Sequence, residues 1–399
     1  MRLEPLPQER PIVPPFFSPS RRGSVYYAGF WAIIGVYAPF MNVYFSRLGL
    51  TASQIGLLST LFPLMMLVTA PVLSALADRY ARRRTMLQAS LVTSALMLFL
   101  LGVPQEFAAL ALVSLVFAFF RSPATAIADG LIARMASRYR LNYGNMRLWG
   151  SLSFAIAAVA SGLAWRQLGF RPMFALAAAL TAPLLLFTTL LEEGPPVDRQ
   201  RRQPFRKVAG NPGLVVIVAS AFLLGAGMNT CFNFGSIYLD SLGGDPFALG
   251  LFSAIMAFCE VPAMRNSDYL LRRLGGPRAL ILASGMSAVA AAGFAVAQGP
   301  TALLVANAGR GFGFGLFYVC AVRLVNDRVP EEWSSTAQAM LGAAMMGLAP
   351  LLSSPVGGWV YDTLGPVALF AGATFVVVLA MAMVIVAAAR GLFTDSPPA

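Results

Sequence analysis

The chain has 399 residues, a net charge of +12 and a mean hydropathy of +0.70; 58% of its residues are hydrophobic and only 12% are charged. A soluble domain carries about 25% charged residues, so this composition predicts a membrane protein that crosses the bilayer many times; the positive charge lies in short clusters between apolar runs, which excludes a nucleic-acid-binding surface. The sequence has no histidine and three widely separated cysteines, so it predicts neither a metal site nor a cofactor.

Apolar segments long enough to cross a bilayer follow one another along the chain. A spanning helix needs about 20 apolar residues. Twelve segments qualify: 24–46, 53–76, 84–103, 106–136, 141–168, 171–191, 213–239, 247–271, 278–298, 300–325, 333–361 and 364–389. Only helices and closed barrels satisfy their backbone polar groups in lipid, and segments of this length are helical. The predicted fold class is therefore an all-α polytopic membrane protein with twelve transmembrane helices.

The charged loops between these segments predict the orientation of the protein. Most of the 29 lysine and arginine residues fall in alternate loops, and cationic loops stay in the cytoplasm. We therefore expect both termini in the cytoplasm of a cell (inner or plasma) membrane protein, with tails at 1–23 and 390–399. The first tail is rich in proline and has no apolar core, so it is not a signal peptide.

The chain divides into two related halves. Residues 192–212 (EEGPPVDRQRRQPFRKVAGNP) are the longest polar interruption. They predict a cytoplasmic linker between six-helix halves at 24–191 and 213–389. Residues 44–59 align without gaps on residues 238–253 and share six of sixteen residues. Two homologous sets of six helices with a central site between them are a transporter architecture.

A charged hairpin lies in the first half, at RSPATAIADGLIARMASRYRLNYGNMRLWGSLSF (121–154). Asp129 precedes the expected turn and Arg147 follows it, so antiparallel helices place both charges about 10 Å from the turn. An ionised side chain in lipid is costly, and is usually functional and partnered. We therefore predict that Asp129 and Arg147 pair and line the central cavity. The alternative is that both residues only end their helices at the membrane surface.

The loop after the second apolar segment, SALADRYARRR (74–84), resembles the signature loop of the major facilitator superfamily, and MRNSDYLLRR (264–273) is a weaker second copy. In that loop an acidic residue and several arginines hold the cytoplasmic ends of helices together. The resemblance implies this latch role for Asp78, Arg79, Arg82, Arg83, Asp268 and Arg272. A latch that breaks in one conformation suits a two-state transporter, and charge anchoring at the membrane surface is the alternative.

Three further segments narrow the resemblance. They are similar to the lactose-permease-like branch, and specifically to its phenylpropionate-permease-like members: YGNMRLWGSLSF (143–154), FCEVPAM (258–264) and GRGFGFGLFYVCAV (309–322). In that branch an acidic residue on the fourth helix and an arginine on the fifth bind substrate. The resemblance implies this role for Asp129 and Arg147, which lie 18 positions apart. It also implies that Phe154 lies against a substrate ring, with packing inside the protein as the alternative.

Three more charged residues fall inside apolar segments. Glu260 lies mid-helix in ALGLFSAIMAFCEVPAM, and a carboxyl in apolar surroundings suits reversible protonation; we predict it as the first choice for proton coupling, with Asp129 second, and a structural ion pair is the alternative. Arg310 stands where members of the branch often carry histidine. Because arginine stays charged, we expect Arg310 to select an anionic substrate, with helix packing as the alternative. Arg121 is predicted either to line the same cavity and bind substrate or to pair with Glu260.

These features favour a secondary transporter. An enzyme is not expected, because no nucleophile–base pair, metal-ligand set or carboxylate dyad is present. We expect proton-coupled uptake of a small organic acid, with aromatic acids included, by a monomer whose partners are the substrate, protons and the lipid bilayer. Two alternatives stay open: a symporter of a neutral sugar or nucleoside, and an exporter of amphipathic compounds. The fifth segment lacks the Gly-Pro pattern of superfamily antiporters, which disfavours export.

Cysteines introduced into residues 192–212 are expected to stay unlabelled when a membrane-impermeant maleimide is added to intact cells, because this segment is predicted to be cytoplasmic. The same cysteines should react once the cells are permeabilised. Ready labelling of intact cells would contradict the predicted orientation.

Overall fold

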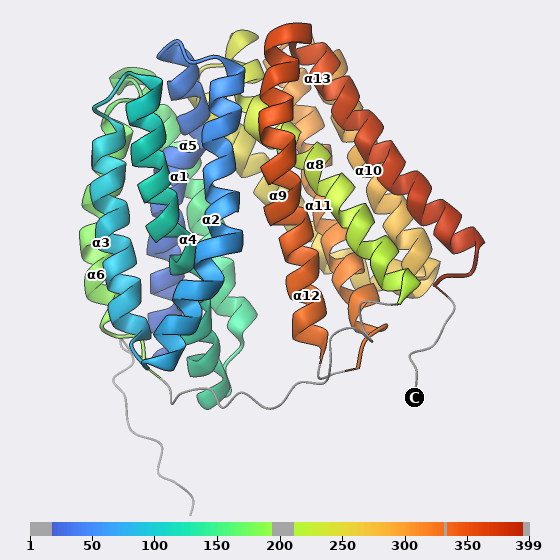
Figure 1. Ribbon diagram of the computed structural model, residues 1–399, viewed down its shortest axis with the longest axis horizontal. Coiled ribbons are helices and arrows are strands. Elements are labelled where there is room, and N and C mark those ends of the chain that lie inside the picture. Colours follow the sequence, from blue (N-terminus) through green and yellow to red (C-terminus); the bar gives the residue numbers. More distant parts are fainter. Residues whose placement is uncertain (1–17, 194–210, 331–332, 394–399) are drawn as a thin grey trace, which may run out of the picture.

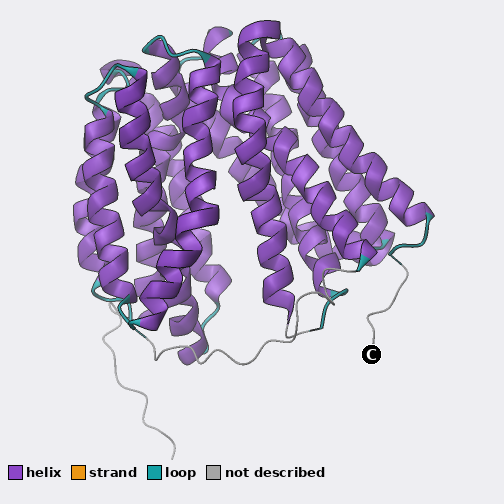
Figure 2. Cartoon of the chain, viewed as in Figure 1, coloured by secondary structure: helices purple, strands orange, loops and turns teal. Residues whose placement is uncertain are grey.

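The computed structural model describes residues 18–193, 211–330 and 333–393, and all regular structure in these ranges is helical (Figures 1 and 2). The N-terminal half contains α1 (Pro19–Arg47), α2 (Ala52–Arg79), α3 (Arg83–Leu101), α4 (Phe107–Arg138), α5 (Tyr143–Leu168) and α6 (Pro172–Thr188). The C-terminal half contains α8 (Pro212–Ser241), α9 (Pro246–Leu274), α10 (Gly276–Val296), α11 (Pro300–Asn326), α12 (Ser334–Gly342), the π-helix η3 (Ala343–Leu348) and α13 (Ala349–Ala389). The predicted all-α fold class is confirmed.

Local side chains specify where several helices begin. Thr51 and Gln54 form a capping box at the start of α2, and the side chains of Asn142, Asn211 and Asp245 accept a backbone hydrogen bond at the starts of α5, α8 and α9. These caps satisfy amide groups that a first helical turn leaves free. Proline stands in the first turn of α6, α8, α9 and α11. It favours a helix start because its missing N–H costs nothing there.

The described chain crosses the bundle twelve times. Ten helices are long and apolar enough to span a membrane, and α6 is a shorter apolar helix. The last of the ten, Thr336–Ala389, has 54 residues and bends at Gly365, whose φ of 85° is a conformation that glycine adopts without strain. This segment therefore makes two crossings, and the number of helical passes agrees with the prediction.

The helix ends lie within a few residues of the predicted spans, with one difference at the N-terminus. α1 begins at Pro19, so the last residues of the predicted 1–23 tail are helical. Proline at the first helical position extends α1 in this direction, since its φ is already helical. The predicted linker at 192–212 lies mostly outside the described residues, and α13 ends at Ala389, where the 390–399 tail was predicted to begin.

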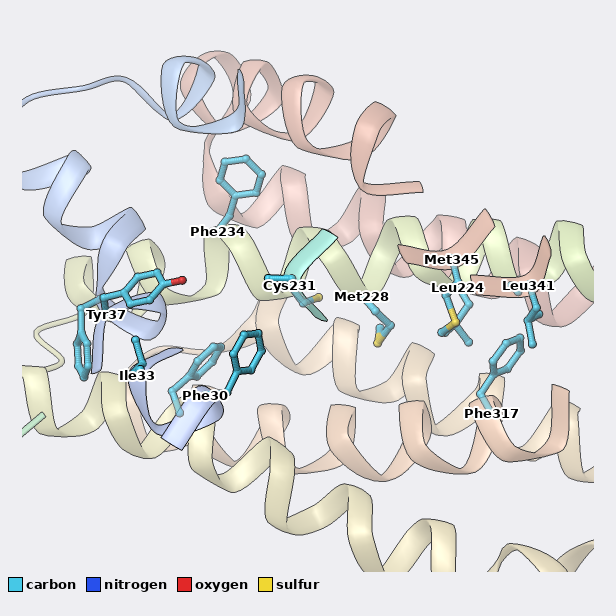
Figure 3. Packing of buried hydrophobic residues seen from close by; sticks show 14 of the residues in the cluster. Phe30, Ile33, Tyr37, Leu224, Met228, Cys231, Phe234, Phe317, Leu341 and Met345 are labelled. Carbon is cyan, nitrogen blue, oxygen red and sulfur yellow. The ribbon is translucent and has the colours of Figure 1, made fainter. Parts of the chain in front are cut away.

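Apolar packing holds each half together and also joins the two halves. α1 packs on α5 in the first half and α8 packs on α13 in the second, whereas α5 packs on α9 and α2 packs on α13 across the halves (Figure 1). The buried hydrophobic residues form one cluster that runs through both halves. Figure 3 shows part of it, with Leu224, Met228 and Cys231 on α8 and Phe317 on α11.

The two ends of the bundle differ in the contacts that cross between the halves. We call the end where α1 begins and α13 finishes the terminal end; the opposite end holds the turns between α1 and α2 and between α8 and α9. At the opposite end two ion pairs join the halves. Arg47 Nη2 lies 2.6 Å from Asp240 Oδ1, and Arg166 Nε lies 3.3 Å from Asp245 Oδ2.

Asp362 of α13 adds a third tie between the halves at the opposite end. Its carboxylate accepts hydrogen bonds from the backbone amides of Ala52 (2.9 Å) and Ser53 (2.8 Å) and from the Ser53 hydroxyl (2.5 Å). These amides belong to the first turn of α2, which has no carbonyl partner for them within the helix. A negative charge is also favourable at a helix N-terminus. The C-terminal half thus supplies the carboxylate that caps the N-terminus of α2 in the N-terminal half.

Glycines let the two backbones approach at the same end. A methyl group at Gly162 of α5 would lie 2.6 Å from the carbonyl oxygen of Pro246 on α9, and one at Gly358 of α13 would lie 2.7 Å from the Cα atom of Ser53 on α2. Both distances are too short for a Cβ atom. The close contact between the halves therefore depends on glycine at these positions.

At the terminal end the ion pairs of the described residues stay within one half. Asp78 pairs with Arg83, and its Oδ1 atom lies 3.6 Å from Arg134 Nη2 on α4. These contacts join α2, α3 and α4 around the first signature loop, and the latch role stays a prediction. In the second copy of the loop, Asp268 and Arg272 form no ion pair with any residue of the described ranges.

Glu192, which follows α6, forms a second cluster at the terminal end. Its carboxylate lies 3.4 Å from Arg22 and 3.3 Å from Arg138, and it accepts a 2.9 Å hydrogen bond from the Tyr139 hydroxyl. This hydrogen bond raises the pKa of Tyr139, because the proton is shared with a carboxylate. All four residues belong to the N-terminal half. Among the described residues, the ion pairs that join the two halves are thus those at the opposite end.

Asp362→Ala is expected to weaken closure of the opposite end, because it removes the carboxylate that caps α2 from the other half. Loss of such a cap costs about 1 kcal/mol, which shifts the ratio of closed to open molecules about fivefold. Pulsed electron paramagnetic resonance between spin labels at Gln167 and Leu364, both exposed at this end, should detect a larger fraction of long distances.

Asp327→Ala is the matched control. Asp327 is exposed and lies 3.7 Å from Arg323 within α11 at the terminal end, so its removal should leave the distance distribution unchanged. An unaltered distribution in Asp362→Ala would show that Asp362 does not hold this end closed.

Candidate functional site

The predicted hairpin residues meet two aromatic side chains of α1. Tyr27 and Trp31 are four residues apart, so they share one face of the helix. The Tyr27 hydroxyl donates a 2.6 Å hydrogen bond to Asp129 Oδ1 on α4 and lies 2.8 Å from the hydroxyl of Tyr143 on α5. Asp129 is half-buried, and its carboxylate is therefore satisfied by a hydroxyl donor rather than by a cation.

Arg147 of α5 lies against the same aromatic pair. Its Cζ atom is 4.3 Å from the ring centroid of Trp31 and 5.5 Å from that of Tyr27, a geometry in which the ring faces attract the guanidinium. Arg147 Nη1 is buried and has no hydrogen-bond partner among the described residues. The expected ion pair between Asp129 and Arg147 is not formed, because Tyr27 occupies the carboxylate and the two rings hold the guanidinium.

Phe154 packs against the edge of this arrangement. Its ring centroid lies 6.3 Å from that of Trp31, and the planes are nearly perpendicular at 85°. This is a favourable edge-to-face contact, so Phe154 steadies the ring under Arg147. Such packing is the alternative that the sequence left open, and contact of Phe154 with a substrate ring stays a prediction.

Glu260 of α9 faces the guanidinium groups of both halves. It is half-buried and has no hydrogen bond or ion pair within the described chain, yet Arg310 and Arg147 both lie within electrostatic range of its carboxylate. A methyl group at Gly315 of α11 would lie 2.9 Å from Glu260 Cγ, so this glycine makes room for the glutamate. Among the described residues Glu260 is therefore a carboxylate without a hydrogen bond or ion pair, within electrostatic range of one cation of its own half and one of the other half.

Arg310 of α11 is enclosed by hydrogen-bond acceptors. Only 2% of the residue is exposed. Its Nε donates to Asn307 Oδ1 (2.7 Å), its Nη1 to the carbonyl oxygen of Met228 (3.3 Å) and its Nη2 to Met256 Sδ (2.9 Å). The expected neutralisation by Glu260 does not take the form of an ion pair within 4 Å. These bonds tie α8, α9 and α11, as the packing alternative requires.

Arg121 lies apart from the other charges. Its side chain lines a small cavity between α1, α3, α4 and α6, inside the N-terminal half. No hydrogen bond or ion pair joins it to Asp129, Arg147 or Glu260 within the described ranges. The predicted pair of Arg121 with Glu260 is thus absent from this conformation, because Arg121 lines a cavity formed by helices of the N-terminal half, whereas Glu260 lies on α9.

Sequence reasoning missed the groups that hold the predicted charges. The four-residue spacing of Tyr27 and Trp31 in the first apolar segment was the signal that could have identified them. A second missed feature is a cluster of amide and hydroxyl groups at the contact of α8 and α13. Its members are Asn229, Asn233, Ser353 and Ser354, joined by hydrogen bonds of 2.9–3.3 Å, and Asn42 of α1 donates to the Asn233 carbonyl at 3.1 Å. Paired Asn and Ser residues inside apolar runs were the available signal.

Comparison with known proteins gives one family. The profile described as MFS_1 like family matches residues 22–372. The maltose permease of Geobacillus stearothermophilus is 28% identical over 86% of this chain and 89% of its own length. The "Probable 3-phenylpropionic acid transporter" of Escherichia coli is 26% identical over 83% of this chain and 88% of its own.

Among solved structures, a variant of the nucleoside transporter NupG superposes with a TM-score of 0.82 at 18% identity, covering 92% of this chain and 99% of that protein. At this identity the similarity establishes the fold alone. The named relatives carry a sugar, an aromatic acid and a nucleoside, so similarity by itself leaves the substrate class to the chemistry of the site.

Asp129→Ala is expected to abolish transport while the protein still reaches the membrane. Removing the carboxylate leaves the Tyr27 hydroxyl without its acceptor, at a cost of about 1–3 kcal/mol, and takes away a negative charge within electrostatic range of Arg147. Tyr27→Phe removes only the hydroxyl, a hydrogen bond to a charged group worth about 1.5–3 kcal/mol, and should lower the transport rate at least tenfold. Tyr44→Phe is the control, since the buried Tyr44 has no side-chain hydrogen bond within the described chain. Full activity of Asp129→Ala would refute its assignment to the site.

Proposed function

This chain belongs to the MFS_1 like family of secondary transporters, and we propose that it takes up a small organic acid, preferably an aromatic one, together with protons. The protein is a multi-pass membrane transporter and not an enzyme. Substrate class, coupling ion and direction are the proposed parts. They rest on the charged residues of α4, α5, α9 and α11 and on the aromatic residues of α1 that contact them.

The observation that carries the proposal is the free guanidinium of Arg147. Three arginines and two acids lie inside apolar helices, which leaves a surplus of positive charge. Arg147 is the half-buried arginine of this set, and its Nη1 atom has no partner in the described structure. A carboxylate accepts two parallel hydrogen bonds from a guanidinium, so a substrate acid would satisfy this group.

The side chains around Arg147 suit an aromatic acid. Tyr27 and Trp31 of α1 lie against the guanidinium, and Phe154 of α5 packs on Trp31. Such a group of rings favours stacking with a ring of the substrate. The relative named for 3-phenylpropionic acid is consistent with this chemistry. Arg310 is the second candidate for recognising the acid, although its three donor nitrogens are engaged in this conformation.

Glu260 supplies a route to proton coupling without histidine. In the described conformation its carboxylate lies within electrostatic range of Arg147 and Arg310. When a substrate carboxylate pairs with Arg147, Glu260 loses part of its compensation, and a carboxylate that loses a cationic neighbour takes up a proton more readily. Binding of the acid would thereby recruit one proton to α9, and both would be released together after the halves reorient.

A neutral sugar or nucleoside is the second candidate class. The cluster of Asn42, Asn229, Asn233, Ser353 and Ser354 carries donors and acceptors of the kind that bind hydroxyl groups, and relatives named for maltose and nucleosides agree with it. In the described conformation these side chains bond to one another and to the backbone. We therefore rank this class below the acid, for which an unsatisfied donor is present.

The test is uptake of 3-phenylpropionate and of its uncharged amide by proteoliposomes, with and without an imposed inward proton gradient. Wild type should accumulate the acid when the gradient is present and should discriminate against the amide. Arg147→Gln should lose this discrimination. Glu260→Gln should still exchange the acid across the membrane but should no longer accumulate it against a gradient.

Arg310→Gln distinguishes the role of Arg310 from that of Arg147 in recognising the acid. If it loses the preference for the acid while Arg147→Gln keeps it, recognition belongs to Arg310 and the assignment to Arg147 is wrong. Equal transport of acid and amide by wild type, or transport of maltose or a nucleoside in place of the acid, would reject the proposed substrate class.

A further inference from the structure

A cavity of about 20 Å³ lies inside the N-terminal half, away from the contact between the halves. Side chains from α1, α3, α4 and α6 line it, among them Phe30, Ser94, Arg121 and Thr181. We propose that this cavity is a binding site for a single halide-sized anion, chloride in the cell, held by Arg121. The site is independent of the proposed substrate.

Arg121 needs a counter-charge that the described chain does not supply. Only 7% of the residue is exposed, and its Nη1 atom is buried without a hydrogen-bond partner. Its one described contact is with the face of Phe30, whose centroid lies 4.2 Å from Cζ. A ring face attracts a cation but does not neutralise it, and a charge inside an apolar bundle is usually paired.

The nearby carboxylate is already engaged. Asp129 lies two helical turns along α4, accepts its 2.6 Å hydrogen bond from Tyr27, and forms no ion pair with Arg121. No carboxylate is among the residues that line the cavity. The described residues thus give Arg121 neither a counter-charge nor the set of hydrogen-bond acceptors that encloses Arg310, and an anion in the cavity would supply the missing charge.

Two other buried hydroxyl groups in the neighbourhood of Arg121 are unused. Ser94 is 3% exposed and Tyr26 is 0% exposed, and both hydroxyl oxygens lack a partner among the described residues. Ser94 lines the cavity, and Tyr26 lies within electrostatic range of Arg121. Thr181 donates its own proton to the Ala177 carbonyl. The unused groups are thus hydroxyl and guanidinium donors, which together complement an anion.

The size of the cavity decides between anions. A space of about 20 Å³ is on the scale of one small particle, and a monatomic halide matches it better than a carboxylate substrate or a phosphate does. A water molecule would also fit and would satisfy Ser94. It would leave the charge of Arg121 uncompensated, which is why we assign the cavity to an anion.

Thermal unfolding of the purified protein tests the site. At equal ionic strength, wild type in sodium chloride or bromide should unfold at least about 2 °C higher than in sodium gluconate, since a ligand that binds the folded state stabilises it. Arg121→Gln and Ser94→Val, which fills the cavity, should both lose this halide dependence. Arg310→Gln alters a buried arginine of the other half and should retain it.

Crystals of wild type grown in bromide give a second test that needs no variant. The anomalous signal should place one bromide beside Arg121 and Ser94. A cavity that holds only water, with no anomalous peak and no halide effect on unfolding, would overturn the proposal. A halide effect that survives in both Arg121→Gln and Ser94→Val would overturn it as well.

Discussion

The cost of placing charge inside apolar helices shapes this protein more than any other constraint. Lipid offers an ionised group no solvent, so each one requires a partner from the protein. The partners are mainly neutral: Tyr27 for Asp129, the rings of Trp31 and Tyr27 for Arg147, and carbonyl, amide and thioether groups for Arg310. Neutral partners hold charges in place without cancelling them, and the interior keeps a positive potential available to a ligand.

The contacts between the halves follow a different rule from those within them. Apolar packing fixes the helices inside each half, and apolar packing with short glycine contacts also joins the halves. Charged groups also join the halves at the opposite end. Arg47 and Arg166 each pair with an aspartate of the other half, and Asp362 accepts hydrogen bonds from backbone amides of the other half. Because such groups can return to water when they separate, the same interface can open without stranding buried polar atoms.

The sequence was sufficient for the helices, their number and the depth of the charged residues, because hydropathy and charge patterns act along one chain. It was insufficient for predicting which side chains contact one another. Asp129 and Arg147 are at matching depth, yet whether they touch depends on how α1 is rotated and on which side of it Tyr27 emerges. The contacts of Arg121 and Arg310 could not be predicted for the same reason. Their neighbours come from other helices, and the distances between those helices are set by glycine and alanine packing that a linear pattern does not encode.

The glycine contacts between α5 and α9 and between α2 and α13 bear on how the protein moves. Backbone carbonyls there lie against Cα atoms of the facing helix, where weak Cα–H···O interactions operate over a very short range. An attraction that disappears within an ångström of separation gives no stable halfway position. Opening of that end is therefore expected to be cooperative: the contact between the halves is either fully formed or fully broken. A conformation open on both sides of the membrane at once is then rarely populated.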